Sequence, residues 1–470
     1  MMNRKHLSNL ILLSFLLSSC VDKVESPNFI FILVDDQGWN GTSVQMMNSD
    51  TLSKSDYHET PNLEKLASSG IKFSNAYSSA PVCAPSRYSI QFSKTPARLS
   101  LIRVGMNSDH IDHEGMMSIP KALKEINSDY VTAHFGKWGI GSSPELVGYD
   151  FSDGPNQNRE GGFVNDTSQW NCEVKEDPKH IFNLSEKAVN FLNENSKNPF
   201  YLQISHYAVH SNIQAREKSL NKYELKEKGS QQINPGFAAM TEDLDEGLGL
   251  IIDKVQELGL DDNTYIIYMS DNGSVPNIPG AKKYDLSYNY PLQRGKWDAM
   301  EGGVRVPLII SGPDIEKGIE SNVPVSGSDI LPTLIDLAGS SNIELHEIDG
   351  GSFSKVIKGN ENHVLERGVK GLFFHVPYRN GIALKRPHSA VRNGDFKLIR
   401  FYDNDEIQLY NLNEDISESN NLAKLNIEKA NELENILDEY LKEVHAPRWQ
   451  EGITWKNTPI HIINSFHEFE

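Results

Sequence analysis

The stretch NFIFILVDDQG, residues 28 to 38, runs from a continuous apolar segment directly into polar residues. An unbroken apolar run of this length is typical of a parallel β-strand that is buried on both faces. Asp35 and Asp36 follow at its carboxyl end, which is where open α/β sheets bind their ligands. The stretch therefore predicts an α/β fold with a functional site at this edge of the sheet.

Two later stretches repeat this pattern. PFYLQIS, residues 199 to 205, is followed by His206, and TYIIYM, residues 264 to 269, leads through a serine to Asp271 and Asn272. Further strands are expected at 130–135 and 307–311, and helices from residue 60 and over 118–126, 240–258 and 329–339. Strands that alternate with helices predict a mostly parallel central sheet with helices on both of its faces.

The pattern changes after about residue 360. Residues 388–401 and 406–412 alternate apolar and polar side chains around short turns, as antiparallel strands do. Residues 428–443 place their apolar side chains on one face of a helix. We therefore expect a larger domain over 28–360 and a smaller C-terminal domain of antiparallel sheet and helix over 361–470.

The N-terminus resembles an export signal. A basic segment at residues 4–6 precedes an apolar segment at 10–17, which is too short to span a bilayer. The following Leu-Ser-Ser-Cys, which ends at Cys20, resembles a bacterial lipobox. We expect a signal peptide over 1–19, lipidation of Cys20, a tether over 20–27, and an exported protein anchored to a bacterial membrane in the periplasm or at the cell surface. An ordinary signal peptide that is cleaved nearby is the alternative.

The composition restricts the partners of this chain. It has 64 acidic and 45 basic residues and a formal net charge of −19. Such a charge argues against nucleic acid as a partner. A site for an anion would have to be a local cluster of cations.

If Cys20 carries lipid, Cys83 and Cys172 are the remaining cysteines. A disulfide between them would be ordinary in an exported protein. The other interpretation is that Cys83 has a chemical role and that Cys172 is incidental. The residues around Cys83 must decide between the two.

Four oxygen-bearing side chains follow two of the predicted buried strands: Asp35, Asp36, Asp271 and Asn272. Hard oxygen donors of this kind suit Ca²⁺ or Mg²⁺ rather than a soft metal. The alternative is that each side chain caps a turn, as aspartate often does at the end of a strand. Two such pairs on neighbouring strands favour the metal site.

Basic residues stand in the loops of the same segment: Arg87, Lys137, His210 and Lys296. Each taken alone is an ordinary solvated surface charge. Together, after strands or in Gly-rich turns, they could surround a tetrahedral oxyanion and neutralise the charge of a transition state.

At this point the chain resembles the type I sulfatases of the alkaline phosphatase superfamily, and in particular bacterial polysaccharide sulfatases. The resemblance covers about residues 27 to 445, and its most specific element is CAPSR, residues 83–87, which matches C-x-P-S-R. Further similar segments, in the same order along the chain, are DDQG at 35, GKW at 136, AVHSN at 208, SDNG at 270 and RGKWDAMEGG at 294.

The resemblance implies a mechanism for sulfate-ester hydrolysis. A formylglycine-generating or sulfatase-maturating enzyme would oxidise Cys83 to formylglycine, whose hydrated form attacks sulfur and then expels sulfate. Arg87 would hold this group, Lys137 and Lys296 would bind the sulfate, and His210 would protonate the departing alcohol. The modified Cys83 would also join Asp35, Asp36, Asp271 and Asn272 around one Ca²⁺ ion, with Mg²⁺ as the alternative.

The sequence departs from the family pattern at two places. Gly139, in GKWGIG, stands where a histidine is usual, and Phe92-Ser93 stands where the maturation segment usually reads Thr-Gly. Either another group, such as His206 or a water molecule, replaces the missing histidine, or turnover is impaired. The resemblance implies that the segment with Phe92-Ser93 helps the maturation enzyme recognise Cys83. The second departure therefore bears on whether Cys83 is modified.

The resemblance and the export signal predict a sulfated polysaccharide or oligosaccharide as substrate, for example algal ulvan or carrageenan fragments. Residues that could contact it are His206, His375, Arg386 and His388. One alternative is a phosphodiesterase or phosphonate monoester hydrolase of the same superfamily. A catalytically silent protein that binds sulfated glycans is the other.

Overall fold

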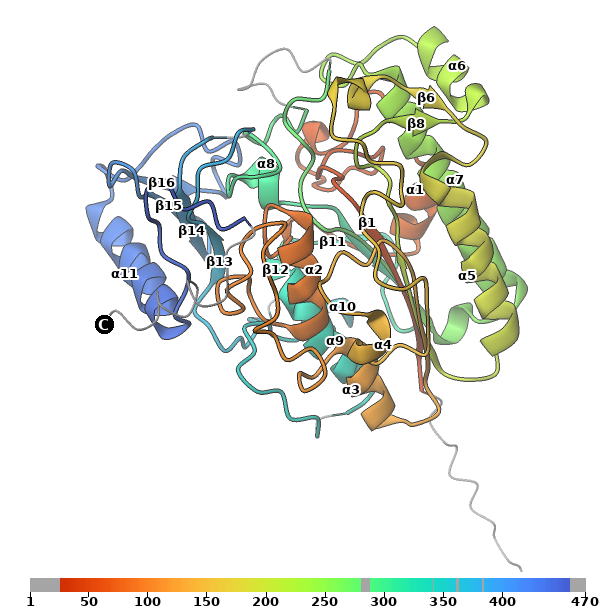
Figure 1. The fold of residues 1–470 in the computed structure, drawn as a ribbon. Coiled ribbons are helices and arrows are strands. Elements are labelled where there is room, and N and C mark those ends of the chain that lie inside the picture. The colour runs from red at the N-terminus through yellow and green to blue at the C-terminus, as the bar shows by residue number, and fades with distance from the viewer. Residues whose placement is uncertain (1–25, 280–287, 341, 361–362, 383, 457–470) are drawn as a thin grey trace, which may run out of the picture.

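The structure is a computed structural model that describes residues 26–279, 288–340, 342–360, 363–382 and 384–456. The expected signal peptide, Cys20 and most of the tether lie outside these residues. Figure 1 shows a large α/β body and, beside it, a smaller body built from the C-terminal part of the chain. Within the described ranges, no helix is both long enough and apolar enough to cross a membrane.

An eight-stranded sheet forms the centre of the large body, in the order β11-β2-β10-β9-β1-β7-β4-β5. The strands are β1 (Asn28–Val34), β2 (Gly70–Phe73), β4 (Val131–Gly136), β5 (Phe151–Ser152), β7 (Phe200–Ser205), β9 (Thr264–Ser270), β10 (Leu308–Ser311) and β11 (Ile319–Ser321). All pairings are parallel except those of β10, which runs antiparallel to β2 and β9. The mostly parallel sheet expected from the sequence is confirmed.

The register of the three central strands brings the predicted polar residues together. Val34 pairs with Ser270, and Leu33 pairs with Ser205. Every residue of β1, β7 and β9 is buried. The residues that follow these strands therefore emerge side by side at the carboxyl edge of the sheet.

Helices cover both faces, as expected (Figure 1). Phe29, Phe31 and Leu33 of β1 lie in one apolar cluster, whose helices are α2 (Cys83–Phe92), α3 (Ile119–Ile126), α9 (Ile330–Leu337) and α10 (Ser354–Ile357). The alternate residues Ile30 and Ile32 lie in the opposite cluster, with α1 (Pro61–Ser68), α5 (Ile181–Asn195) and α7 (Pro235–Glu257). Because successive side chains of a strand point to opposite faces, a single apolar strand anchors both layers.

Helix α7 begins five residues earlier than the sequence pattern predicts. The side chain of Asn234 accepts a hydrogen bond from the backbone N–H of Phe237, and Pro235 occupies the first helical position. Both features favour a helix start. The remaining short elements are β3 (Ala76–Tyr77), β6 (Glu173–Val174), β8 (Gln214–Ala215), β12 (Val325–Ser326), α4 (Pro144–Val147), α6 (Glu217–Leu225) and α8 (Glu301–Val304).

The smaller body is a four-stranded antiparallel sheet with one helix. Its strands, in spatial order, are β13 (Leu372–Val376), β14 (His388–Asn393), β15 (Phe396–Phe401) and β16 (Ile407–Asn411), and its helix is α11 (Ile427–Glu443). Leu398 and Leu409 of the sheet pack with Leu433 and Leu437 of α11. The antiparallel sheet and helix expected at the C-terminus are confirmed, and β13 is an additional strand.

A buried charge network joins the two bodies. Lys397 of β15 forms ion pairs of 2.8 Å with Glu301 of α8 and with Glu418, and Glu301 also pairs with Arg305 at 2.6 Å. Burial alone would lower the pKa of Lys397, but the two glutamates raise it above its usual value. The lysine therefore stays charged inside the interface.

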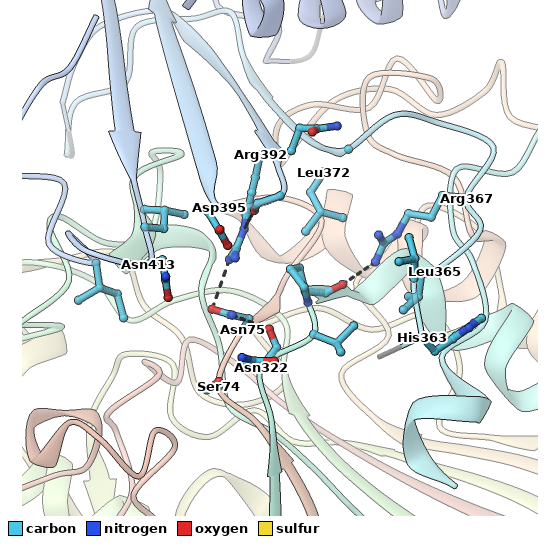
Figure 2. A pocket seen from close by; sticks show the side chains of 18 of the residues that line it. Ser74, Asn75, Asn322, His363, Leu365, Arg367, Leu372, Arg392, Asp395 and Asn413 are labelled. Carbon is cyan, nitrogen blue, oxygen red and sulfur yellow. Dashed lines mark hydrogen bonds between the residues drawn. The ribbon is translucent and has the colours of Figure 1, made fainter. Parts of the chain in front are cut away.

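A cavity of about 810 Å³ also lies at this junction (Figure 2). Its guanidinium groups already have protein partners. Arg367 pairs with Asp329 at 2.6 Å, and Arg392 donates hydrogen bonds to Asn75 and Tyr77. These contacts connect the two bodies, so the arginines here have a structural role.

Replacement of Lys397 by methionine should destabilise the protein by about 3 to 5 kcal/mol, because Glu418 and Glu301 would lose a buried countercharge. Chemical denaturation measures the change. The matched control is Lys429→Met, which removes a partly exposed pair with Glu432 and should cost less than about 1 kcal/mol. Equal losses in the two variants would contradict the proposed role of the network.

Candidate active site

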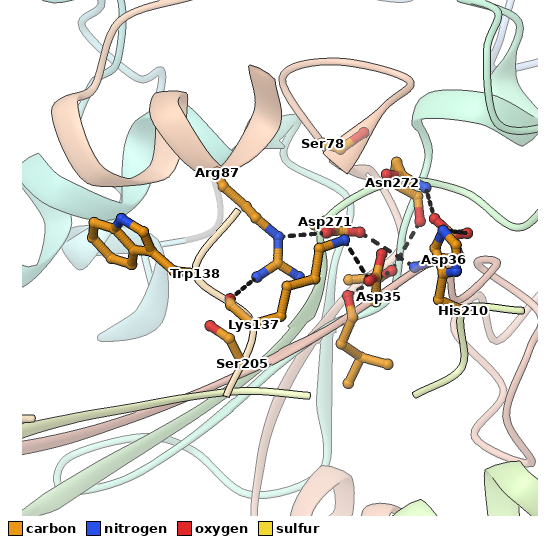
Figure 3. A network of polar contacts seen from close by, with 12 residues as sticks. Asp35, Asp36, Ser78, Arg87, Lys137, Trp138, Ser205, His210, Asp271 and Asn272 are labelled. Atoms are coloured by element: carbon orange, nitrogen blue, oxygen red, sulfur yellow. Dashed lines mark hydrogen bonds and ion pairs between the residues drawn. The ribbon is translucent and has the colours of Figure 1, made fainter. Parts of the chain in front are cut away.

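The polar side chains that follow the central strands form one buried cluster (Figure 3). Asp35 and Asp36 follow β1, and Asp271 and Asn272 follow β9. At most 2% of any of these four residues is exposed. The structure thus brings together the four oxygen donors that the sequence analysis identified.

Three cations neutralise the carboxylates of this cluster. Lys137, which follows β4, lies 2.5 Å from Asp35 Oδ2, and Lys296 lies 2.7 Å from Asp36 Oδ1. The Nε of Arg87 donates to Asp271 Oδ2 at 2.8 Å. Isolated buried charges are very unfavourable, so this pairing is what allows the acids to remain inside the protein.

Cys83 is the first residue of α2 and is 6% exposed. Its sulfur and carboxylate oxygens of Asp35 and Asp271 all lie within 4.8 Å of one another. Cys83 and Cys172 are both free cysteines, so the disulfide considered from the sequence is absent. The helix start places Cys83 at the positive end of the α2 dipole, where a developing negative charge is stabilised.

The cluster has free oxygen atoms that suit a cation. Asp35 Oδ1 and Asn272 Oδ1 are buried and lack hydrogen-bond partners within the part of the chain that is described. Buried polar atoms normally have a partner, and carboxylate and amide oxygens are the ligands that Ca²⁺ and Mg²⁺ prefer. The residues present therefore fit a hard divalent cation held by Asp35, Asp36, Asp271, Asn272 and the group at position 83.

The two facing carboxylates differ in their pKa values. Burial, together with the negative charge of Asp35, raises the pKa of Asp271 to about 6. Burial also acts to raise the pKa of Asp35, but the positive charges around it, led by Lys137, hold it well below its usual range. A bound cation would favour the charged form of both acids.

His210 lies at the edge of this cluster and is 7% exposed. Its Nδ1–H donates to the backbone oxygen of Ser211 at 2.6 Å, which leaves Nε2 directed toward Asp36 Oδ2 at 3.6 Å. Phe163 packs edge-on against the ring at 4.8 Å. Burial and the nearby Lys296 lower the pKa of His210 to about 4.

A cavity of about 860 Å³ opens above the cluster. Cys83, Lys137, His210 and Lys296 line its inner part together with Asp36, while Arg87 lies behind Asp271. The sequence analysis missed Arg103, Asn158 and Arg159, which belong to the outer part of the lining. These residues lie in irregular loops, where no periodic pattern reveals which side chains converge.

The structure does not bring the other predicted contact residues to this cavity. His375 hydrogen-bonds Ser389 and the backbone of Pro447 in the small body. Arg386 pairs with Asp403 and Glu406, and the buried His388 hydrogen-bonds the backbone of Arg386 and Ala299. Their side chains are occupied by contacts within the small body and, for His388, by a contact with Ala299 of the large body.

His206 is fully buried and is not among the residues that line the cavity. Neither ring nitrogen has a hydrogen-bond partner among the described residues, and burial lowers the pKa of this histidine to about 4. It is therefore a neutral histidine inside the protein.

Comparison with known proteins agrees with the site. The family model described as "Sulfatase" matches residues 27–340, and the model "N-sulphoglucosamine sulphohydrolase, C-terminal" matches residues 296–447. The chain therefore belongs to the sulfatase family, whose members are sulfuric ester hydrolases that typically use a metal ion and formylglycine.

Several relatives are similar over most of their length. A "Sulfatase" of Formosa agariphila is 26% identical, with 96% of both chains covered. An "Ulvan-active sulfatase" of the same organism is 27% identical, with 92% of this chain and 86% of that protein covered. Among solved structures, "Ps i-CgsB" has a TM-score of 0.72 at 24% identity and covers 95% of this chain and 98% of its own, which supports the fold.

The two departures from the family pattern, at Gly139 and at Phe92-Ser93, differ in how the surrounding backbone and side chains accommodate them. Gly139 has a φ of +75°, and a Cβ there would lie 2.9 Å from Arg87 Cδ. Ser93 has a φ of 56° and ends α2 in the left-handed conformation that glycine favours, held by a hydrogen bond of 2.7 Å to the backbone of Ser328. The backbone at position 93 thus retains a glycine-like conformation, whereas position 139 leaves no room for a side chain while Arg87 keeps this position.

Substitution of Gly139 by alanine should lower kcat/KM for sulfate release about 100-fold, because the added Cβ would displace the Arg87 side chain and shift the groups around it. Gly259→Ala is the matched control, since Gly259 has a φ of +65° and open space around its Cβ position. Both variants should lose about 1 to 3 kcal/mol of stability from backbone strain. Equal activity of the two variants would contradict the role assigned to Gly139.

Calcium should raise the free energy of unfolding by about 2.7 kcal/mol at a free concentration of 100 times Kd. Asp35→Asn should remove most of this increase, because it removes a charged oxygen ligand. Thermal unfolding with calcium and with a chelator measures the difference, and Asp262→Asn, at a surface turn, is the control. An undiminished calcium response in Asp35→Asn would place the ion elsewhere.

Proposed function

We propose that this protein is a calcium-dependent sulfatase that removes sulfate esters from a sulfated polysaccharide or oligosaccharide. The observation that carries the proposal is the position of Cys83. It begins α2 beside the buried carboxylates Asp35 and Asp271, and it faces a cavity that Lys137 and Lys296 also line. A nucleophile, a cation site and two sulfate-binding cations therefore meet at one point.

Two relatives support a glycan as substrate. One of the two Formosa agariphila relatives is described as an ulvan-active sulfatase, and "Ps i-CgsB" was solved in complex with k-i-k-neocarrahexaose. We infer that this chain also acts on a sulfated carbohydrate, and algal polysaccharides such as ulvan or carrageenan fragments are the first class to test. The cavity is much larger than a sulfate group, which suits a saccharide substrate.

In the proposed mechanism, a formylglycine formed from Cys83 supplies an oxygen nucleophile, and a bound Ca²⁺ favours its deprotonated form. Lys137 and Lys296 bind the sulfate oxygens and neutralise charge that develops in the transition state. Arg87 keeps Asp271 in place through its Nε contact. These residues hold the ester for attack at sulfur.

His210 is the proposed general acid. Its Nδ1–H is engaged by Ser211, so Nε2 is the nitrogen that exchanges a proton with the leaving alcohol. Without substrate, burial and the nearby Lys296 lower the pKa of His210 to about 4. The negative charge of a bound sulfate ester would raise this pKa and favour the protonated form that the step needs.

We also propose that the protein is exported and lipid-anchored through Cys20, and that a maturation enzyme modifies Cys83 before or during export. The basic and apolar segments at 4–6 and 10–17 and the lipobox-like residues that follow support this. We also propose a domain boundary at about residue 360, because the sequence pattern changes there from alternating strands and helices to antiparallel strands.

Gly139 and the Phe92-Ser93 departure favour one other candidate, a sulfated-glycan-binding protein without turnover. Such a protein would retain the cavity and its cations. It would bind glycans equally well with alanine at position 83.

The deciding experiment starts with protein made together with a maturation enzyme. Tandem mass spectrometry of the peptide around Cys83, combined with an aldehyde probe, should find formylglycine. The same preparation should release sulfate from sulfated oligosaccharides and leave the matching phosphate esters largely intact. Preference for phosphate esters would instead indicate a phosphodiesterase or phosphonate hydrolase.

Two variants test the assigned roles. Cys83→Ala should abolish sulfate release, and His210→Gln should lower kcat about 100-fold or more for substrates with poor leaving groups. An activated aryl sulfate should be much less sensitive to His210→Gln, because its leaving group needs no proton. An unmodified thiol at position 83 and no sulfate release would overturn the hydrolase and favour the binding protein.

A further inference from the structure

We propose that the outer part of the active-site cavity holds a second anion-binding subsite formed by Arg103, Arg159 and Lys456. Its ligand would be a further anionic group of the substrate, either a second sulfate or a carboxylate on a neighbouring sugar. This inference deepens the proposed function, on which it rests. It makes a saccharide with at least two anionic groups the preferred substrate.

The charge of the cavity lining is opposite to that of the chain. The lining contains five lysines and arginines, namely Arg103, Lys137, Arg159, Lys296 and Lys456, and one acid, Asp36. The chain as a whole has a formal net charge of −19. Such a local reversal of charge concentrates anions in the cavity and repels cationic ligands.

These cations fall into two groups. Lys137 and Lys296 are paired with the buried Asp35 and Asp36 and belong to the inner site. Arg103, Arg159 and Lys456 form no ion pair with any carboxylate of the described residues. The outer cations thus have charge available for a ligand.

The junction cavity provides a contrast within the same molecule (Figure 2). Its lining has three lysines and arginines, and three acids, Glu320, Asp395 and Glu414, balance them; Arg367 also donates two hydrogen bonds to Asp329. An excess of cations over acids is therefore a feature of the active-site cavity, and the described lining of the junction cavity does not share it.

Arg103 is held in place by neighbours that carry no charge. Its guanidinium lies 4.7 Å from the ring centre of Tyr378 and 5.8 Å from that of Trp297, and Nη1 donates to the backbone oxygen of Thr454 at 2.8 Å. Its Nε is buried and has no hydrogen-bond partner within the described ranges. A guanidinium fixed in this way loses little conformational entropy when it binds an anion.

The same contacts connect the outer subsite to the inner site. Trp297 directly follows Lys296, and its backbone N–H donates to Pro81 while its backbone oxygen accepts from Asn380. The residue that supports Arg103 is thus next in sequence to a proposed sulfate-binding lysine. A substrate could place one anionic group on Lys296 and Lys137 and a second one toward Arg103.

Aromatic residues of the same cavity lining suit a sugar ring. Phe163, Trp170 and Trp297 line the same cavity, and aromatic rings provide flat apolar faces against which carbohydrate C–H groups can pack. Cations together with aromatic rings favour an anionic saccharide over a small inorganic anion.

The test uses Arg159→Gln and Arg103→Met, of which the second keeps the aliphatic contact with the aromatic rings. Lys424→Gln is the matched control, because it removes one positive charge at an exposed position outside the cavity. The substrates are three disaccharides: one with a single sulfate, one with a second sulfate on the neighbouring ring, and one with a carboxylate there.

In the unaltered enzyme, kcat/KM should be higher for the substrates with two anionic groups. In Arg159→Gln and Arg103→Met, the ratio of kcat/KM for two anionic groups to that for one should fall about tenfold, which corresponds to the loss of one charge-assisted hydrogen bond. The two doubly anionic substrates identify whether sulfate or carboxylate is preferred. An unchanged ratio in both variants would overturn the subsite.

A binding measurement that needs no modified cysteine distinguishes failure of the proposed hydrolysis from failure of the subsite. Titration calorimetry with Cys83→Ala protein and the same disaccharides should show tighter binding of the two-anion compounds, and this preference should fall when Arg159→Gln is added. If no substrate releases sulfate but the preference is present, the hydrolase proposal fails and the subsite stands. Equal affinity for one and two anionic groups would overturn the subsite.

Discussion

The ion pairs between three buried acids and three buried cations are the interaction on which the rest of this structure depends. Asp35, Asp36 and Asp271 leave water when strands β1 and β9 align, and burial without partners would be far too costly for the fold to tolerate. Lys137, Lys296 and Arg87 reach them from three other segments of the chain. The cluster therefore holds these segments together, and it also prepares a set of charges that can bind a cation and an oxyanion.

The negative net charge of the chain does not prevent an anion from binding in the cationic cavity, because salt screens the more distant charges. At physiological ionic strength, charges separated by more than about 8 Å are largely screened. An anionic substrate in the cavity therefore responds mainly to the cations that line it, and the acidic surface elsewhere has little effect.

The departures from the family pattern have different physical consequences. Ser93 adopts a left-handed conformation that a nearby hydrogen bond supports, so the turn after α2 survives without glycine. At position 139 the close approach of Arg87 requires a residue without Cβ, so the difference extends to the packing around the arginine. The site is thus arranged around a glycine, and a histidine could not be added there without movement of Arg87.

The sequence by itself determined the α/β class, the small antiparallel body and the residues of the buried cluster, because continuous apolar strands, alternating strands and short motifs are local patterns. Helix α7 began earlier than its apolar pattern indicated, since Asn234 caps it. Only the tertiary structure separated His375, Arg386 and His388 from the cavity and brought Arg103, Arg159 and Lys456 to it. The side chains of His375, Arg386, His388 and Arg103 are directed by contacts distant in sequence, and such contacts leave no periodic signal in the chain.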